Sequence, residues 1–161
     1  MTAQRRPKSR PEPASKLKLR LWLRLLQTSH SIEVELRRRM RLAFNVTLPK
    51  FDVMSALERK GCGMTMTELS RFLMVSNGNV TGIVDRLVAE GMVVRSAHED
   101  DRRATYVRLT REGAEQFATM ARAHEGWVNE ILADLSREDS DAMVGLLDML
   151  RVKPQAAEHQ Q

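Results

Sequence analysis

The residues with the clearest capacity for chemistry form two polar clusters in the middle of the chain. Short polar side chains recur from Ser76 to Thr81, and a charged turn, HEDDRR, runs from His98 to Arg103. Polar side chains at the N-terminus of a helix can donate hydrogen bonds to phosphates and read base edges. Arginines at a protruding turn suit the negative potential of a narrow minor groove. Both clusters therefore point to nucleic-acid recognition.

The candidate DNA contacts come from both clusters, with one further arginine from the helix expected after Ser76. They are Ser76, Asn77, Asn79, Thr81, Arg86, Arg102 and Arg103. Ser76 and Asn77 could instead only cap that helix, and we expect both roles for Ser76. The two arginines of the turn could pair with Asp100 and Asp101 and stiffen it. We expect one arginine in each role.

A third cluster, ELRRRMR, spans residues 35–41 and holds four arginines in five positions. One solvated helix face does not need so many, since Arg37 and Arg41 align while Arg38 and Arg39 point elsewhere. Arginine binds carboxylate and phosphate groups in two-point geometry. An anionic ligand would satisfy some of these side chains. Salt bridges to a partner chain, together with attraction to the DNA backbone, explain the cluster equally well.

Catalytic motifs are absent from the sequence, so an enzyme is not expected. There is no glycine-rich phosphate loop, HExxH, cysteine pair or nucleophile elbow. The four histidines, His30, His98, His124 and His159, show no metal-ligand spacing relative to Cys62, so we expect neither metal nor cofactor. Cys62 lies between two glycines, and a redox-sensing repressor is one alternative function. A constitutive winged-helix DNA-binding module that senses no ligand is another.

Composition places the chain among helical globular proteins. Its 161 residues are 42% hydrophobic, 29% charged and only 4% aromatic, which favours helices over a large sheet. Residues 1–41 carry 12 basic and 3 acidic side chains, whereas residues 42–161 carry 14 and 18, so the positive charge is concentrated at the N-terminal end. One cysteine excludes an intrachain disulfide and indicates the cytoplasm. No apolar run approaches the ~20 residues that would span a membrane.

Six helices and a hairpin are expected to position the three clusters. Leucines alternate with basic residues after Lys16, as in a strand, but Leu, Lys and Arg favour helix. We predict helices over about 16–44, 49–60, 67–74, 76–90, 111–133 and after Ser136, with strands over 92–95 and 105–109. Thr110 and Ser136 are the predicted caps of the last two helices, and Gly91 the residue that ends the fourth.

Two of these helices have a clear buried face. For residues 49–60 we expect burial of Phe51, Val53, Met54 and Leu57. For residues 76–90 we expect burial of Val80, Ile83, Val84, Leu87 and Val88. The order helix, short helix, turn, helix and hairpin over residues 49–110 is that of a winged helix-turn-helix, whose second helix enters the major groove. The predicted fold is therefore mainly α with a small β-hairpin.

Two segments carry a resemblance to a known family. MTELSRFLMVSNGNVTGIVDRLVAEGMVVR (66–95) and DDRRATYVRLTREG (100–113) resemble the multiple antibiotic resistance regulators, the MarR family. The resemblance implies a homodimer on a double-stranded, pseudo-palindromic operator. It implies a dimerisation helix (16–48), a DNA-binding lobe (49–110) and further dimerisation helices (111–152). Their polar composition predicts that residues 1–15 are a flexible basic arm and residues 153–161 a loose tail.

The resemblance also assigns roles to residues of the wing, the hairpin that flanks the recognition helix. Arg103 would reach the minor groove, and Asp101 begins the D-x-R pattern of the wing. Asp85 would pair with wing arginines and hold the wing against the recognition helix. One departure is Gly82, where many members carry arginine, so one phosphate or base contact of the family is missing.

Finally, the resemblance implies a small anionic, often aromatic effector between the dimerisation helices and the DNA-binding lobe, which releases a repressor from its operator. An aromatic acid or its acyl-CoA thioester would fit the arginines. The candidate effector-binding residues are Trp22, Leu26, Ser29, His30, Arg37, Arg38, Arg39, Arg41, Phe51 and His124. Each apolar member could instead belong to the dimer core.

Overall fold

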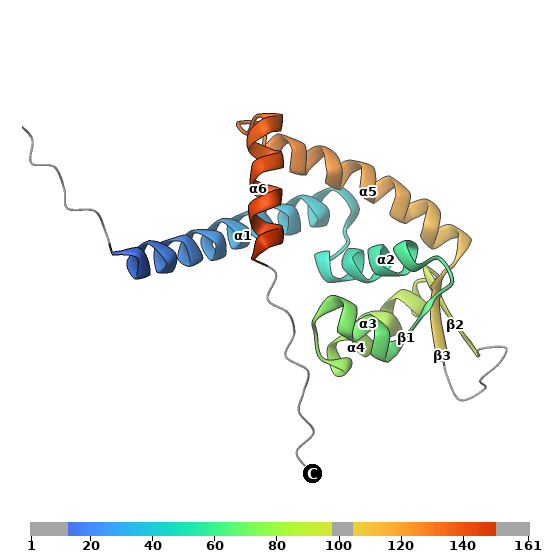
Figure 1. Cartoon of the computed structure of the whole chain (residues 1–161). Coiled ribbons are helices and arrows are strands. Elements are labelled where there is room, and N and C mark those ends of the chain that lie inside the picture. Colours follow the sequence, from blue (N-terminus) through green and yellow to red (C-terminus); the bar gives the residue numbers. More distant parts are fainter. Residues whose placement is uncertain (1–12, 98–104, 151–161) are drawn as a thin grey trace, which may run out of the picture. The chain divides into compact units, whose positions relative to one another are not determined.

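The computed structural model describes residues 13–97 and 105–150, which form six α-helices and three short β-strands (Figure 1). The predicted class, mainly α with a small antiparallel sheet, is confirmed. The elements are α1 (Ala14–Phe44), α2 (Leu48–Lys60), β1 (Met64–Thr65), α3 (Met66–Leu73), α4 (Asn77–Ala89), β2 (Val93–Ala97), β3 (Thr105–Leu109), α5 (Arg111–Ile131) and α6 (Arg137–Met149). The charged turn and the two chain ends lie outside the described residues.

The core of the DNA-binding lobe lies where α2, α3 and α4 pack on one another and on the sheet. The four residues expected to be buried on α2 are buried, as are Val80, Val84 and Leu87 of α4. Ile83 is only half-buried, and the expectation for Val88 is wrong, because 37% of its surface is exposed. The buried stripe of α4 follows a spacing of four and three residues, and Val88 lies beside that stripe.

The sheet has the strand order β1-β3-β2, with all pairs antiparallel. The hairpin pairs Val93 with Leu109, and β1 adds Met64 opposite Val107. The sequence did not predict β1, because two residues are too few to show a period. Gly63, just before β1, has a φ of +91°, and a Cβ there would lie 3.0 Å from the Val107 carbonyl oxygen. Glycine therefore permits this close pairing.

Hydroxyl caps begin three of the helices. Thr65 and Glu68 form a capping box at α3, which therefore begins one residue before the predicted Thr67. The Thr110 hydroxyl accepts a hydrogen bond from the Gly113 N–H at 2.9 Å and donates to the Gly91 carbonyl at 2.8 Å. Ser136 accepts from the Asp139 N–H, as predicted. The caps at Thr110 and Ser136 thus confirm those two helix starts.

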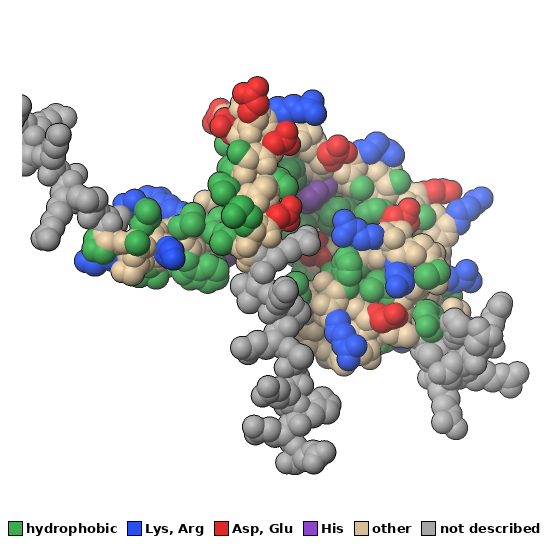
Figure 2. Space-filling view, viewed as in Figure 1, with side chains coloured by type: hydrophobic (Ala, Val, Ile, Leu, Met, Phe, Trp, Pro, Cys, Tyr) green, Lys and Arg blue, Asp and Glu red, His purple; other side chains and the backbone are tan. Residues whose placement is uncertain are grey.

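The helix α1 is buried only near its C-terminal end, where Leu36 and Met40 pack against the lobe. Its N-terminal part exposes a set of large apolar side chains, with basic residues between them (Figure 2). These side chains, each 46–58% exposed, are Leu17, Leu19, Leu21, Trp22, Leu23 and Leu26. The helical prediction for the alternating segment is confirmed. In a strand, leucines at every second position would share one face. In this helix they lie on several sides.

The chain divides into two compact units between His124 and Glu125. The second unit contains α6, none of whose residues is buried. Its exposed apolar residues are Met143, Val144, Leu146, Leu147 and Met149. No helix in the described part of the chain is long and apolar enough to cross a membrane.

Candidate nucleic-acid interface

The N-terminal turn of α4 presents short polar side chains to solvent. Asn77, Asn79 and Thr81 are exposed, while Val80 between them is fully buried. The buried residue fixes the rotation of the helix, so its neighbours must face outward. Thr81 donates a hydrogen bond to the Asn77 carbonyl at 2.8 Å. Ser76 is at the N-cap position, but the predicted cap is wrong in one respect, since its side chain makes no capping hydrogen bond.

An ion pair joins α4 to the hairpin. The Arg95 guanidinium of β2 donates to the Asp85 carboxylate at 2.6 Å. The resemblance implied that Asp85 pairs with wing arginines without naming one, and Arg95 is an arginine of that hairpin, whereas Arg102, Arg103 and Asp101 lie outside the described residues. Arg95 itself was not among the residues singled out from the sequence. Its signal was the period of two along β2, because Val93 is buried and puts Arg95 on the same face of the strand.

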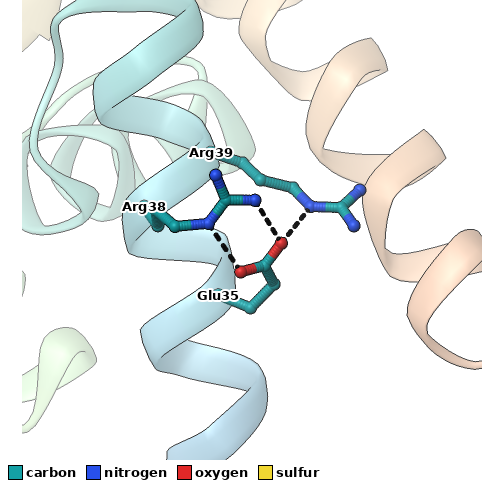
Figure 3. Close-up of polar contacts among 3 residues, drawn as sticks. All are labelled: Glu35, Arg38 and Arg39. Carbon is teal, nitrogen blue, oxygen red and sulfur yellow. Dashed lines mark hydrogen bonds and ion pairs between the residues drawn. The ribbon is translucent and has the colours of Figure 1, made fainter.

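The arginines of α1 have two different environments. Arg38 and Arg39 both donate to the Glu35 carboxylate, at 2.7–2.8 Å (Figure 3). These hydrogen bonds hold the pKa of Glu35 at about 2. Arg37 pairs with Glu33 one turn earlier. Ion pairs within α1 thus account for part of the cluster, and Arg38 and Arg39 need no acidic residue of a partner chain to balance their charge.

The other arginine environment is a cavity of about 630 Å³ between α1, the start of α2 and α4. Three arginines line it, Arg37 and Arg41 from α1 and Arg86 from α4. The remaining lining residues are Thr47, Pro49, Val75, Gly78, Asn79, Gly82 and Ile83. The cavity lining therefore contains positive charge and no carboxylate. Sequence spacing brought Arg37 and Arg41 together, but only the tertiary fold adds Arg86.

The predicted effector residues do not share one environment. Phe51 is buried and stacks on His124, with ring centroids 4.8 Å apart, and Phe117 lies 5.4 Å from Phe51. Burial lowers the pKa of His124. By contrast, Trp22, Leu26, Ser29 and His30 are exposed on the N-terminal part of α1. Within this chain, the three rings form a packed aromatic cluster rather than an open site.

Cys62 is exposed, and its Sγ lies 3.8 Å from the Gly63 carbonyl oxygen. The thiol is therefore accessible to solvent. Among the described residues, no three His, Cys, Asp or Glu side chains are grouped in a way that could hold a metal ion. Among the described residues, the candidate functional surface therefore consists of α4, the hairpin and the arginines of the cavity.

Asp52, on α2, is a carboxylate whose protonation changes close to neutral pH. Partial burial, with the charge of Glu33 nearby, raises its pKa from 3.8 to about 6. A raised pKa means that the folded state favours the protonated form. The wild type therefore loses stability as the pH rises from the unfolded value of 3.8 to the folded value of about 6.

Asp52→Asn removes this pH-dependent loss. We expect the variant to be more stable than wild type at pH 7 by about 1 kcal/mol, a value reduced for solvent screening. The difference in stability should largely disappear at a pH below 3.8, where the Asp52 carboxyl of the wild type is mostly protonated in both the folded and the unfolded state. Urea unfolding at pH 3.5 and pH 7 measures it. An equal difference at the two pH values would rule out this carboxyl as the cause.

Comparisons with known proteins agree with this geometry. The family model described as "MarR family" matches residues 46–105. The transcriptional activatory protein BadR of Rhodopseudomonas palustris is 32% identical, over 74% of this chain and 70% of its own. The crystal structure of a MarR family transcriptional regulator from Silicibacter pomeroyi is 32% identical with a TM-score of 0.71, covering 88% of this chain and all of that one. The chain belongs to the MarR family.

Structural likeness extends to a MarR protein on DNA. The structure of a cysteine-to-serine mutant of MarR from E. coli, complexed with operator DNA, has a TM-score of 0.74 at 22% identity, over 88% of this chain and 100% of that one. MarR family members are DNA-binding transcriptional regulators rather than enzymes. This protein is therefore a DNA-binding transcriptional regulator, and α4 is the helix that corresponds to the recognition helix of the fold.

Proposed function

We propose that this MarR family protein is a homodimeric regulator that binds a double-stranded, pseudo-palindromic operator in the cytoplasm. The observation that carries the proposal is the polar, exposed N-terminal turn of α4 over a fully buried Val80. A recognition helix inserts this end into the major groove. Asn77 and Asn79 carry the amide group that pairs with adenine edges, whereas Ser76, Thr81 and Arg86 are suited to phosphates.

The wing completes the proposed DNA-binding surface. Asp85 is proposed to hold β2 against α4 through Arg95, which fixes the direction in which the hairpin leaves the lobe. Arg102 and Arg103, in the turn of that hairpin, would then contact the adjacent minor groove, with Asp101 stabilising the turn. An exposed ion pair contributes little to stability. We therefore assign the Asp85–Arg95 pair to orientation of the wing.

The homodimer is proposed from exposed apolar surface in both units. Six large apolar side chains of the N-terminal part of α1 and five of α6 are exposed in the single chain. Such patches in a monomer commonly mark protein interfaces. We propose that this interface lies within residues 16–48 and 111–152 and is formed by these eleven side chains.

Sedimentation tests the homodimer directly. The wild type is expected to be a dimer at micromolar concentration. Leu23→Glu, which places a charge in the apolar patch, should shift it toward monomer and weaken operator binding, because the two half-sites would then be bound independently. Leu42→Glu is the matched control, since Leu42 is 72% exposed near the other end of α1. A wild-type monomer at this concentration would contradict the dimer.

We further propose that the protein is a repressor whose operator affinity falls when a small anionic aromatic ligand binds. An aromatic acid or its acyl-CoA thioester would bring both an apolar ring and negative charge. Arg37 and Arg41 line a cavity that such a charge could enter, although Arg37 also pairs with Glu33, whereas Arg38 and Arg39 bind Glu35. Trp22, Leu26, Ser29, His30, Phe51 and His124 are the proposed sources of apolar and polar contact to the ring.

Calorimetry with benzoate and benzoyl-CoA tests the effector. A ligand that prefers the released state by ~1–3 kcal/mol weakens operator affinity about 5- to 150-fold, and the operator must weaken ligand binding by the same factor. Cys62→Ser should leave this response intact. Release by peroxide alone, lost in that variant, would favour the redox alternative. Indifference to benzoate, benzoyl-CoA and peroxide alike would favour a constitutive DNA-binding module.

A further inference from the structure

Three arginines share the cavity between α1 and α4 without enough negative charge to neutralise them. Arg37 is paired with Glu33, and no ion pair of Arg41 or Arg86 with another described residue is found. Arg37 and Arg41 are one turn apart on α1, where like charges repel. Burial of Leu36 and Met40 fixes the side of α1 that faces the lobe. The cavity therefore carries an excess of positive charge that an anion would neutralise.

The wall of this cavity opposite α1 identifies the source of the anion. Gly78, Asn79 and Gly82 form it, and they are exposed residues of the recognition helix. A Cβ placed on Gly78 or Gly82 would meet no atom within 4 Å, so neither glycine is required by packing. Without side chains, the two glycines leave the cavity open along α4, the helix proposed to enter the major groove. The groups that flank a helix in that groove are the phosphates of the DNA strands.

We propose that this cavity binds a backbone phosphate of the DNA duplex, held chiefly by Arg41, with Arg37 and Arg86 beside it. The proposal rests on the proposed binding of α4 in the major groove. It makes the C-terminal end of α1 part of the DNA interface, although α1 lies outside the helix-turn-helix. Guanidinium groups bind phosphate oxygens in two-point geometry, and each such contact releases counterions from the duplex. Arg41 thus contributes affinity without sequence preference.

Arg41→Ala tests the phosphate contact. Two duplexes serve as probes, one selected by the wild type from a random pool and one of random sequence. Fluorescence anisotropy should show about tenfold weaker binding to both. The slope of log affinity against log salt should fall by about 0.9 for each subunit bound. Arg122→Ala removes the same charge from α5, where Arg122 contacts Thr119, and should match the wild type.

A second variant separates the contact from a loss of folding. Gly82 has room for a side chain, so Gly82→Arg can bring a guanidinium to the same cavity from α4. Added to Arg41→Ala, it should restore both the affinity and the salt slope. If Arg41→Ala binds both duplexes like wild type with an unchanged slope, the phosphate contact is wrong while DNA binding by α4 stands.

A competition arm distinguishes DNA phosphate from a small ligand. Calorimetry of the free protein with sodium phosphate, below millimolar concentration, should detect weak or no binding, because an isolated phosphate lacks the other contacts of the duplex. Tight binding of phosphate, benzoate or benzoyl-CoA that Arg41→Ala abolishes, with DNA affinity unchanged, would assign the cavity to a small ligand and overturn the proposal. If the wild type itself binds neither duplex, the proposed function fails first.

Discussion

Replacing Gly113 with alanine is expected to destabilise the protein by at least about 3 kcal/mol. Gly113 lies in the first turn of α5, where a Cβ would be 2.0 Å from the Met92 carbonyl oxygen and 2.9 Å from its carbon. Both are backbone atoms, so no side-chain rotation can relieve the clash. The same carbonyl accepts the Thr110 N–H at 3.0 Å. The strand β2 and the start of α5 would have to separate, and the lobe would lose its sheet.

Gly126→Ala is the control for Gly113→Ala, because it changes the same residue type in the same helix. A Cβ at Gly126 meets nothing within 4 Å. Alanine there should stabilise the protein by up to about 1 kcal/mol, since glycine is a poor helix former. Urea unfolding of both variants measures the contrast. Equal midpoints would show that α5 does not approach Met92 as described.

The second large effect is expected in DNA selectivity rather than in stability. Asn79→Ala should reduce the preference for operator over random duplex by about 1–3 kcal/mol, because it removes a side chain assigned to a base edge. Its salt dependence should stay that of the wild type, since no phosphate contact is lost. Asn129→Ala, at an exposed position on α5, is the matched control. An equal loss of affinity for every duplex would show that Asn79 contacts the DNA backbone rather than a base.

Arg103→Ala, in the hairpin turn, should weaken operator binding by about 1–3 kcal/mol if this arginine reaches the minor groove. Anisotropy with the selected duplex measures it. Unchanged operator affinity, in a variant that folds normally, would show that Arg103 makes no such contact.

Local patterns in the sequence were sufficient for most of the fold. Residue types decided the first helix correctly against its alternating leucines, and the apolar spacing of α2 identified its buried face. The hairpin appeared in the change of period after Gly91. The strand β1 had no such signal, because two residues show no period and its pairing depends on Gly63 approaching Val107.

The candidate site was predicted less completely, because its contacts join segments far apart in the sequence. The exposed asparagines of α4 could be recognised from their position after a cap. The resemblance gave the kind of partner for Asp85, a wing arginine, but not which one, since Arg95 becomes its neighbour only when β2 folds beside α4. Likewise, the cluster on α1 predicted an excess of charge. Only the tertiary structure separates Arg38, which binds Glu35, from Arg41, which lines a cavity with Arg86.

Selection from a random-sequence duplex pool tests the central claim most directly, that a dimer of this chain reads an operator through α4. We expect enrichment of a pseudo-palindrome whose half-site centres are about 10–10.5 base pairs, or a multiple of that, apart. Each selected duplex should bind two chains, and Asn79→Ala should enrich a less defined sequence. Enrichment of no sequence, or of a single half-site bound by one chain, would contradict it.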